Sequence, residues 1–301
     1  MDGLLHRQLD AIACDRRSGA AELAFRAVTA LQAWLRRHPK PAEPELLEIA
    51  TAILHAQPSM APILRVANEV CLAIDSDRPA AMLSRAMSRF HRHLRKAPHK
   101  IAQSFSRWLA RGPRRCVLTY SYSSTVAESL MRARNHIEEV FCSESRPGCE
   151  GIRLARRLAR ARIKTSVTTD ACLFTQTWPG WLLVLGADAV LHAGMAAKVG
   201  SRALAHLHRS IGGATLFLAD TAKFWPERGR NSLRWRPTFG PSGELWKRPP
   251  SNISIYNPYF ERVPYSRKVR LLTEQGWMTP DKIRRELKNI RISLRLQTLA
   301  D

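Results

Sequence analysis

The sequence predicts an α/β protein in which a helical first half, residues 1–112, is followed by a doubly wound, mostly parallel sheet over residues 113–301. Two observations predict this class. Before Gly112-Pro113, apolar residues recur every three or four positions, which is the period of a helix. After it, short apolar runs alternate with helical stretches, as in parallel α/β sheets. A chain of 301 residues, 45% of them hydrophobic, is long enough for two ordinary domains.

The helical half is divided by proline-rich breaks at 39–44 and 58–62, because proline ends a helix or begins the next one. A long basic stretch follows and ends at Gly112-Pro113, and we expect it to form one or two long helices. No strand pattern appears in this half. The expected helical segments are 23–35, 46–54, 63–74 and 79–110.

In the second half the strands are short and apolar, and each is followed by a helical or polar stretch. The expected strands are Cys116–Thr119, Ile137–Cys142, Lys164–Thr168, Leu182–Leu185 and Thr215–Leu218. The expected helices between them are 124–135, 150–162 and 198–210.

Every one of these strands ends in residues that carry hydroxyls, carboxylates or a cation, whereas the strands themselves are apolar. Ligands of open parallel sheets bind outside the carboxyl ends of the strands, so these residues should meet at one site. The polarity that loops normally have would explain one or two of them, but five on one edge favour a site. The residues are 119–124, 143–147, Thr169-Asp170, 186–188 and 220–223.

The residue types at this edge suit a small phosphorylated ligand. Ser123, Ser124 and Thr125 open a helix, where hydroxyls and free backbone N–H groups can hold a phosphate, although simple capping would need only one of them. Lys198, which we expect to begin a helix, and Lys223 can add positive charge.

Asp188 is the best candidate for acid/base work, because it follows an apolar strand and partial burial would raise its pKa. Its alternative role is to cap a helix or to pair with Lys198 or Arg202. The sequence has no Gly-x-Gly-x-x-Gly after a strand and no Walker-type loop, which argues against dinucleotide binding and P-loop chemistry.

The net charge of +23 would attract polyanions without sequence preference. The arginines, however, are spread along expected helices such as 153–162 and 284–295, without the interleaved aromatic residues that stack single-stranded bases. Solvated helix faces are the favoured interpretation, and a nucleic-acid surface or an acidic protein partner are the alternatives.

We expect a cytoplasmic protein, because no apolar run of membrane-spanning length and no signal-peptide core occur. The six cysteines are scattered, and we expect them to be reduced thiols. Neither His91/His93 nor His206/His208 has neighbours that would complete a metal site, so we predict no metal and no cofactor.

The ordered motifs of the chain resemble a superfamily that contains ribose 1,5-bisphosphate isomerase, methylthioribose-1-phosphate isomerase and the regulatory subunits of eukaryotic translation initiation factor 2B. The Tyr-Ser-Ser-Thr and Glu-Ser-Arg-Pro pieces are most similar to the ribose 1,5-bisphosphate isomerase branch. The segments that carry the resemblance are 117–126, 144–151, 185–190, 197–201, 219–224, 257–261 and 279–280, with weaker matches at 18–20 and 57–61.

The resemblance implies a helical N-terminal domain, a Rossmann-like C-terminal domain, and dimers or hexamers formed through the latter. In the isomerases a cysteine and an aspartate handle proton movement during aldose–ketose conversion. The aspartate falls on Asp188 and the cysteine on Ser121. The substrate-binding positions fall on Arg17, Ser18, Gly19, Ser123, Ser124, Thr125, Arg146, Lys198 and Lys223.

This sequence departs from the family pattern at the catalytic positions more than at the residues expected to bind phosphate. A serine hydroxyl needs a separate base where a cysteine can form a thiolate, and an arginine expected near Pro58 appears as Gln57. The first hypothesis is a divergent isomerase-like protein that binds a sugar phosphate or nucleotide, with Asp188 as acid/base. The alternative is a non-catalytic regulator, similar to the factor 2B subunits, that senses a phosphorylated metabolite. Direct nucleic-acid binding is a third possibility.

Overall fold

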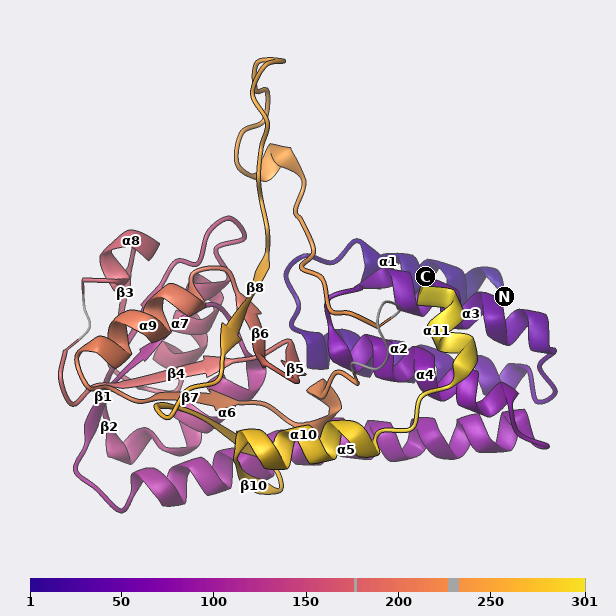
Figure 1. Ribbon diagram of the computed structural model, residues 1–301, viewed down its shortest axis with the longest axis horizontal. Coiled ribbons are helices and arrows are strands. Elements are labelled where there is room, and N and C mark those ends of the chain that lie inside the picture. Colours follow the sequence, from indigo (N-terminus) through magenta and orange to yellow (C-terminus); the bar gives the residue numbers. More distant parts are fainter. Residues whose placement is uncertain (176–177, 227–232, 301) are drawn as a thin grey trace.

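The computed structural model describes residues 1–175, 178–226 and 233–300. It consists of a helical half and an α/β half that lie side by side, with one long helix running under both (Figure 1). The helices of the first half are α1 (Gly3–Ala13), α2 (Ala20–Arg37), α3 (Glu43–Ala56), α4 (Ala61–Ile74) and α5 (Pro79–Leu109). The predicted helices are confirmed, and 79–110 forms one helix rather than two.

Helix α5 belongs to both halves because its apolar stripe is buried along its whole length. Leu83, Met87 and Leu94 pack into the core of the helical half, whereas Ile101 and Phe105 pack under the sheet. The last helix of the chain, α11 (Leu294–Ala300), returns to contact α3 and α4, so both termini lie on the helical half (Figure 1).

The main sheet has seven strands in the order β10-β9-β7-β4-β1-β2-β3, and all neighbours are parallel except β10 and β9. The predicted mostly parallel sheet is therefore confirmed. Its strands are β1 (Arg115–Thr119), β2 (Ile137–Ser143), β3 (Thr165–Thr168), β4 (Leu182–Gly186), β7 (Thr215–Leu218), β9 (Val269–Thr273) and β10 (Gly276–Met278).

Helices cover both faces of this sheet, since successive residues of a strand point to opposite faces. Val117 faces α5 and the helices α6 (Ser124–Arg132) and α7 (Glu150–Arg160). Leu118 faces α8 (Asp170–Leu173), α9 (Ser201–Ser210) and α10 (Pro280–Asn289). The short 3-10 helices are η1 (Arg134–His136), η2 (Thr221–Lys223) and η3 (Ser242–Glu244).

A second, antiparallel sheet was not predicted. It consists of β5 (Ala189–Leu191), β6 (Gly194–Lys198) and β8 (Phe260–Pro264), in the order β5-β6-β8. The prediction that Lys198 begins a helix is therefore wrong: Lys198 ends β6, and α9 begins at Ser201. The carboxylate of Glu261 accepts hydrogen bonds from the N–H groups of Gly200 and Arg202, which places the helix start after the turn.

The predicted helix over 284–295 is also wrong in its second part, because α10 ends at Asn289. Beyond it, the side chain of Asn68 on α4 exchanges hydrogen bonds with the backbone of Arg291 and Ser293, which holds the chain out of a helix. Residues 238–259 form an arm that projects from the seam between the two halves (Figure 1). At its base, Gly240 and Tyr259 pair with Asn257 and Thr238.

Candidate ligand-binding site

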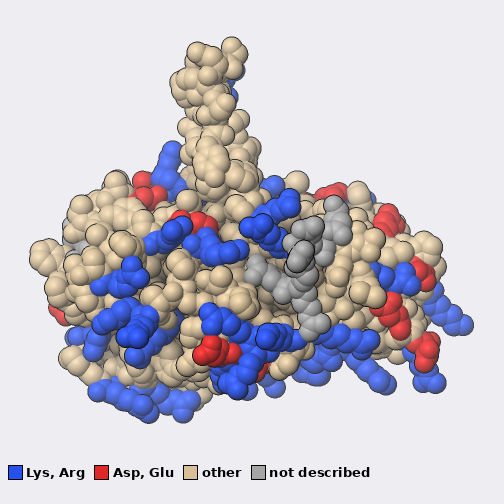
Figure 2. All heavy atoms as spheres, in the orientation of Figure 1, with Lys and Arg blue, Asp and Glu red and all other residues tan. Residues whose placement is uncertain are grey.

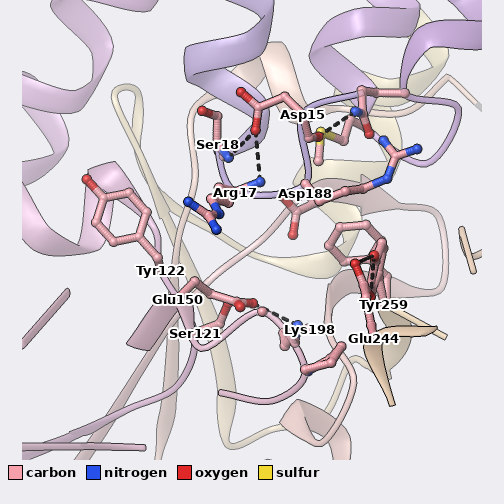
Figure 3. Close-up of a pocket in the computed structure, with 17 residues that line it drawn as sticks. Asp15, Arg17, Ser18, Ser121, Tyr122, Glu150, Asp188, Lys198, Glu244 and Tyr259 are labelled. Atoms are coloured by element: carbon pink, nitrogen blue, oxygen red, sulfur yellow. Dashed lines mark hydrogen bonds and ion pairs between the residues drawn. The ribbon is translucent and has the colours of Figure 1, made fainter. Parts of the chain in front are cut away.

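A cavity of about 320 Å³ lies at the carboxyl ends of the sheet, between the two halves (Figure 3). The helical half contributes the 15–19 loop, Gln57 and Met60, and the base of the arm contributes Glu244, Tyr259 and Phe260. A smaller hollow of about 30 Å³ shares Asp188, Lys198 and Ser121 with it. The α/β residues of the larger cavity are Ser121, Tyr122, Pro147, Gly148, Glu150, Asp188 and Lys198, and the smaller one adds Ser123, Ser124 and Lys223.

Asp188 follows β4 and is held by its backbone. Its N–H donates to the carbonyl of Ala196 at 2.8 Å, and its carbonyl accepts from the N–H of Ala61 at 3.1 Å. The carboxylate has no hydrogen bond or ion pair with any residue that the structure describes. Burial raises the pKa of Asp188, and the positive charges of Lys223 and Lys198 offset this only in part. A raised pKa makes the carboxylate a stronger base, which favours proton transfer.

Lys198 is almost completely buried and forms an ion pair with Glu150, with Nζ 2.7 Å from Oε1. Its Nζ also lies 5.5 Å from the centre of the Tyr259 ring. The alternative pairing of Lys198 with Asp188 is therefore not the one observed. Since Glu150 already neutralises part of the Lys198 charge, Asp188 keeps its carboxylate free for a ligand.

Ser121 donates a hydrogen bond to the same oxygen of Glu150 at 3.0 Å. Its backbone has φ of +66°, a conformation that is uncommon for a residue with a side chain. Its N–H bonds to the hydroxyl of Ser145 at 2.8 Å, which holds it there. Glu150 thus supplies a carboxylate beside the hydroxyl of Ser121, the residue at which the resemblance implies a cysteine.

Lys223 closes the smaller hollow from the turn after β7 and is 4% exposed. The turn is held by Asp220, whose Oδ1 accepts from the N–H of Ala222 at 3.0 Å and lies 3.4 Å from Nε2 of His93 on α5. Burial alone would lower the pKa of His93, but its hydrogen bond and charge interaction with Asp220 raise it. The long helix of the first half therefore helps to place Lys223.

The start of α6 forms part of the wall of the smaller hollow. Ser123 caps the helix, since its Oγ accepts from the N–H of Val126, and Ser124 lines the hollow. A side chain at Gly186 would clash with Ser123, so glycine is needed for this close approach. Thr125 is fully buried and lines neither cavity, so its hydroxyl does not face the ligand space.

The loop that carries Arg17, Ser18 and Gly19 to the cavity is held by hydrogen bonds with Asp15 and Gln57. The Asp15 carboxylate accepts from the N–H groups of Arg17 at 2.8 Å and Ser18 at 2.9 Å. Although burial opposes it, these N–H bonds lower the pKa of Asp15. Gln57, which replaces the arginine expected there, donates to the carbonyls of Ile12 and Asp15. Its amide thus holds the loop in place.

The structure does not bring Arg146 to the cavity. Its side chain is exposed, and its backbone N–H donates to the Asp170 carboxylate at 2.7 Å. The next two residues, Pro147 and Gly148, line the cavity instead.

Among the cavity residues that the sequence pattern did not predict are Glu150, Asp15, Glu244 and Tyr259. Glu150 is the first residue of α7, and an acidic residue there is common because it complements the helix dipole. Tyr259 and Glu244 come from the arm, which had no predicted structure. Their contact is direct, since the Tyr259 hydroxyl donates to the Glu244 carboxylate at 2.6 Å.

The sequence profile of the Initiation factor 2 subunit family matches residues 16–280. The chain belongs to this family. A family relative described as eIF-2B subunit 2-like, from Pyrococcus furiosus, is 32% identical over 245 residues, which is 80% of this chain and 83% of that protein. The ribose 1,5-bisphosphate isomerase of Methanocaldococcus jannaschii is 22% identical over 249 residues, 78% of this chain and 77% of that protein.

The fold of the Initiation factor 2 subunit family is also evident in a solved structure. The crystal structure of the Pyrococcus horikoshii translation initiation factor eIF-2B superposes with a TM-score of 0.77 at 23% identity, over 93% of this chain and 98% of that chain. This family therefore includes proteins named as translation factors and proteins named as sugar-phosphate isomerases, and this chain is similar to both.

Among the described residues, no helix could cross a membrane. Nor does the described part of the chain contain a group of three His, Cys, Asp or Glu side chains that could hold a metal ion.

Proposed function

We propose that the cavity binds a sugar phosphate and that Asp188 transfers a proton in aldose–ketose isomerisation of the bound sugar. The observation that carries the proposal is the unpaired Asp188 carboxylate beside two nearly buried lysines, Lys198 and Lys223, in one cavity. The isomerase from Methanocaldococcus jannaschii named above supports the substrate class.

In this proposal the two lysines and the start of α6 hold phosphate. Ser123 and Ser124 at the start of α6 line the same hollow as Lys223, and the free N–H groups of a helix start suit a phosphate group. Arg17 and Ser18 lie across the larger cavity and can hold the other end of the sugar. Asp188 lines both the cavity and the smaller hollow, so it would lie beside the carbon chain of a sugar that spans them.

The isomerisation moves hydrogen within the sugar and needs no external oxidant. The hydrogen at C2 passes to C1 and the C2 hydroxyl becomes a carbonyl. In a sugar phosphorylated at C1, the bond from C1 to the ring oxygen breaks and the proton of the C2 hydroxyl passes to that oxygen, so the step balances. Asp188 is suited to exchange the proton because its pKa is raised. Ser121, whose hydroxyl donates to Glu150, stands where the family's cysteine would otherwise act.

A second candidate function is a non-catalytic regulator that binds the same ligand. Ser121 in place of the cysteine favours it, and so does the likeness to the Pyrococcus furiosus protein described as eIF-2B subunit 2-like. Both candidates include self-association through the α/β half, as the family resemblance implies.

The test is calorimetric titration with ribose 1,5-bisphosphate, ribose 1-phosphate and inorganic phosphate, followed by an assay for ketose formation. We expect Lys223→Ala to weaken binding of the bisphosphate by about 10- to 100-fold, the usual cost of a lost charged hydrogen bond. Asp188→Asn should retain binding and abolish ketose formation. Lys247→Ala, an exposed lysine on the arm, is the control.

Ketose formation by the native protein, lost in Asp188→Asn, would establish the isomerase. Binding without ketose formation, both in the native protein and in Ser121→Cys, would contradict the isomerase and support the non-catalytic regulator. Absence of binding to all three compounds, or equal binding by Lys223→Ala, would refute both.

A further inference from the structure

The solvent face of α5 carries a continuous line of positive charge. Residues 78–127 include eleven Lys and Arg and no Asp or Glu. Most of these cations lie on one face of the helix, because they are separated by three, four or seven positions. We call this set the α5 stripe; its exposed members are Arg85, Arg89, Arg92, Lys96, Lys100 and Arg107.

The positive charge of the α5 stripe is almost unpaired by acidic side chains among the described residues. A solvated helix of ordinary composition mixes both signs and forms pairs at i,i+4. Within the described residues, the stripe has one ion pair, Arg89 to Glu69 at 3.2 Å, and nearby His99 contacts Glu128. The opposite face of α5 is buried in the two cores, so the stripe is fixed to a rigid body.

The positive surface continues past the end of α5. A hollow at the amino edge of the parallel strands is lined by four arginines. A neighbouring hollow shares Arg134 with it and reaches Ser106 on α5, which joins the two surfaces. Figure 2 shows Lys and Arg side chains gathered along the lower edge of the molecule, where Figure 1 places α5. We call Arg114, Arg134, Arg160 and Arg162 the arginine cluster.

We propose that the α5 stripe and the arginine cluster bind the phosphate backbone of a double-stranded nucleic acid. A helix of 31 residues is about 46 Å long at 1.5 Å per residue, which matches about 14 base pairs at 3.4 Å each. Guanidinium groups bind phosphate in a bidentate way.

The surface chemistry selects this partner over others of the same charge. None of the exposed large apolar side chains among the described residues lies on α5 or in the arginine cluster. The exposed Trp277 packs edge-on against Trp108 of α5, and the described part of the surface offers no continuous row of aromatic or apolar side chains that would stack unpaired bases or enter a bilayer. The arginine cluster lies at the opposite edge of the sheet from the ligand cavity, and no member of the α5 stripe lines that cavity or the smaller hollow, so the proposal does not depend on what the cavity binds.

The test is fluorescence anisotropy with labelled RNA and DNA duplexes of about 20 base pairs, measured from 50 to 200 mM salt. The stripe variant combines Arg85→Gln, Arg92→Gln, Lys96→Gln and Lys100→Gln. The control variant removes the same charge elsewhere, through Arg7→Gln, Lys40→Gln, Arg202→Gln and Lys247→Gln, all at exposed positions. Circular dichroism and the ligand titration check that both variants are folded.

We expect the stripe variant to lose affinity for a duplex by about 30-fold or more, and its slope of log K against log salt to fall by about 3 to 4. The control variant should stay within about threefold of the native protein. Comparison of the RNA and DNA arms identifies the natural duplex. Equal losses in both variants, tighter binding of single strands, or binding of phosphatidylserine vesicles without binding of duplexes would overturn the proposal.

Discussion

The ligand cavity and the α5 stripe both depend on positive side chains, but they use them in opposite ways. In the cavity, Lys198 and Lys223 are buried, and Lys198 has an ion-pair partner in Glu150. On the α5 stripe the cations are exposed and all but Arg89 lack an ion pair in the described chain. A buried charge must be paired or matched by a ligand, so it selects a small anion in one position. Exposed charges instead create a field that suits a long polyanion.

The largest expected effect is a difference in salt dependence between the two regions. Between 50 and 200 mM salt, duplex affinity should fall by about 10³-fold, because six to ten phosphate contacts release counterions. Affinity of the cavity for ribose 1,5-bisphosphate should fall by less than about tenfold, because buried charges are screened less. Anisotropy and calorimetry on one preparation measure both. Parallel salt curves would show that the two regions do not differ in this way.

A smaller effect is expected from Glu150→Gln, which removes a negative charge from the cavity. Lys198 would lose its partner and become available to phosphate, so affinity for the bisphosphate should rise by about 3- to 10-fold. Duplex affinity should not change. The matched control is Glu138→Gln, at an exposed position on β2. A loss of ligand affinity in Glu150→Gln would mean that Glu150 orients Lys198 rather than competing for it.

The smallest effect concerns the stability of the cavity without ligand. Burial raises the pKa of Asp188, so its ionised form destabilises the folded state as pH rises from the ordinary aspartate value through the raised one. Asp188→Asn avoids this and should raise the Tm by about 1–3 °C at pH 7. The gain should vanish only well below the ordinary aspartate pKa, toward about pH 3, where the carboxyl is protonated in both the folded and the unfolded state. Thermal melts across this pH range measure it, and a lower Tm at pH 7 would contradict it.

The main sheet could be predicted because its strands are short apolar runs bounded by polar residues, and all five expected strands occur. The small sheet could not. Gly194–Lys198 is too weakly apolar to indicate a strand, and it becomes one only by pairing with Ala189–Leu191 and Phe260–Pro264. Such long-range pairing leaves no local pattern, which is why Lys198 was assigned to a helix.

The site residues likewise divide into those that the sequence could predict and those that it could not. Ser121, Asp188 and Lys223 follow strands of one parallel sheet, so their convergence follows from local pattern and sheet geometry. Arg146 also follows a strand, but its neighbours Pro147 and Gly148 face the cavity in its place. No local sequence pattern indicates which of these adjacent residues lines the cavity.

By itself, the sequence determined the class of the fold, the edge of the sheet where polar residues meet and the charge along residues 79–110, because these depend on period and residue type. Only the tertiary structure decided that Lys198 forms its ion pair with Glu150, so that Asp188 has no ion-pair partner among the described residues. It also decided that the α5 stripe continues into the arginine cluster. These relations join residues far apart in the chain, and packing rather than local propensity brings them together.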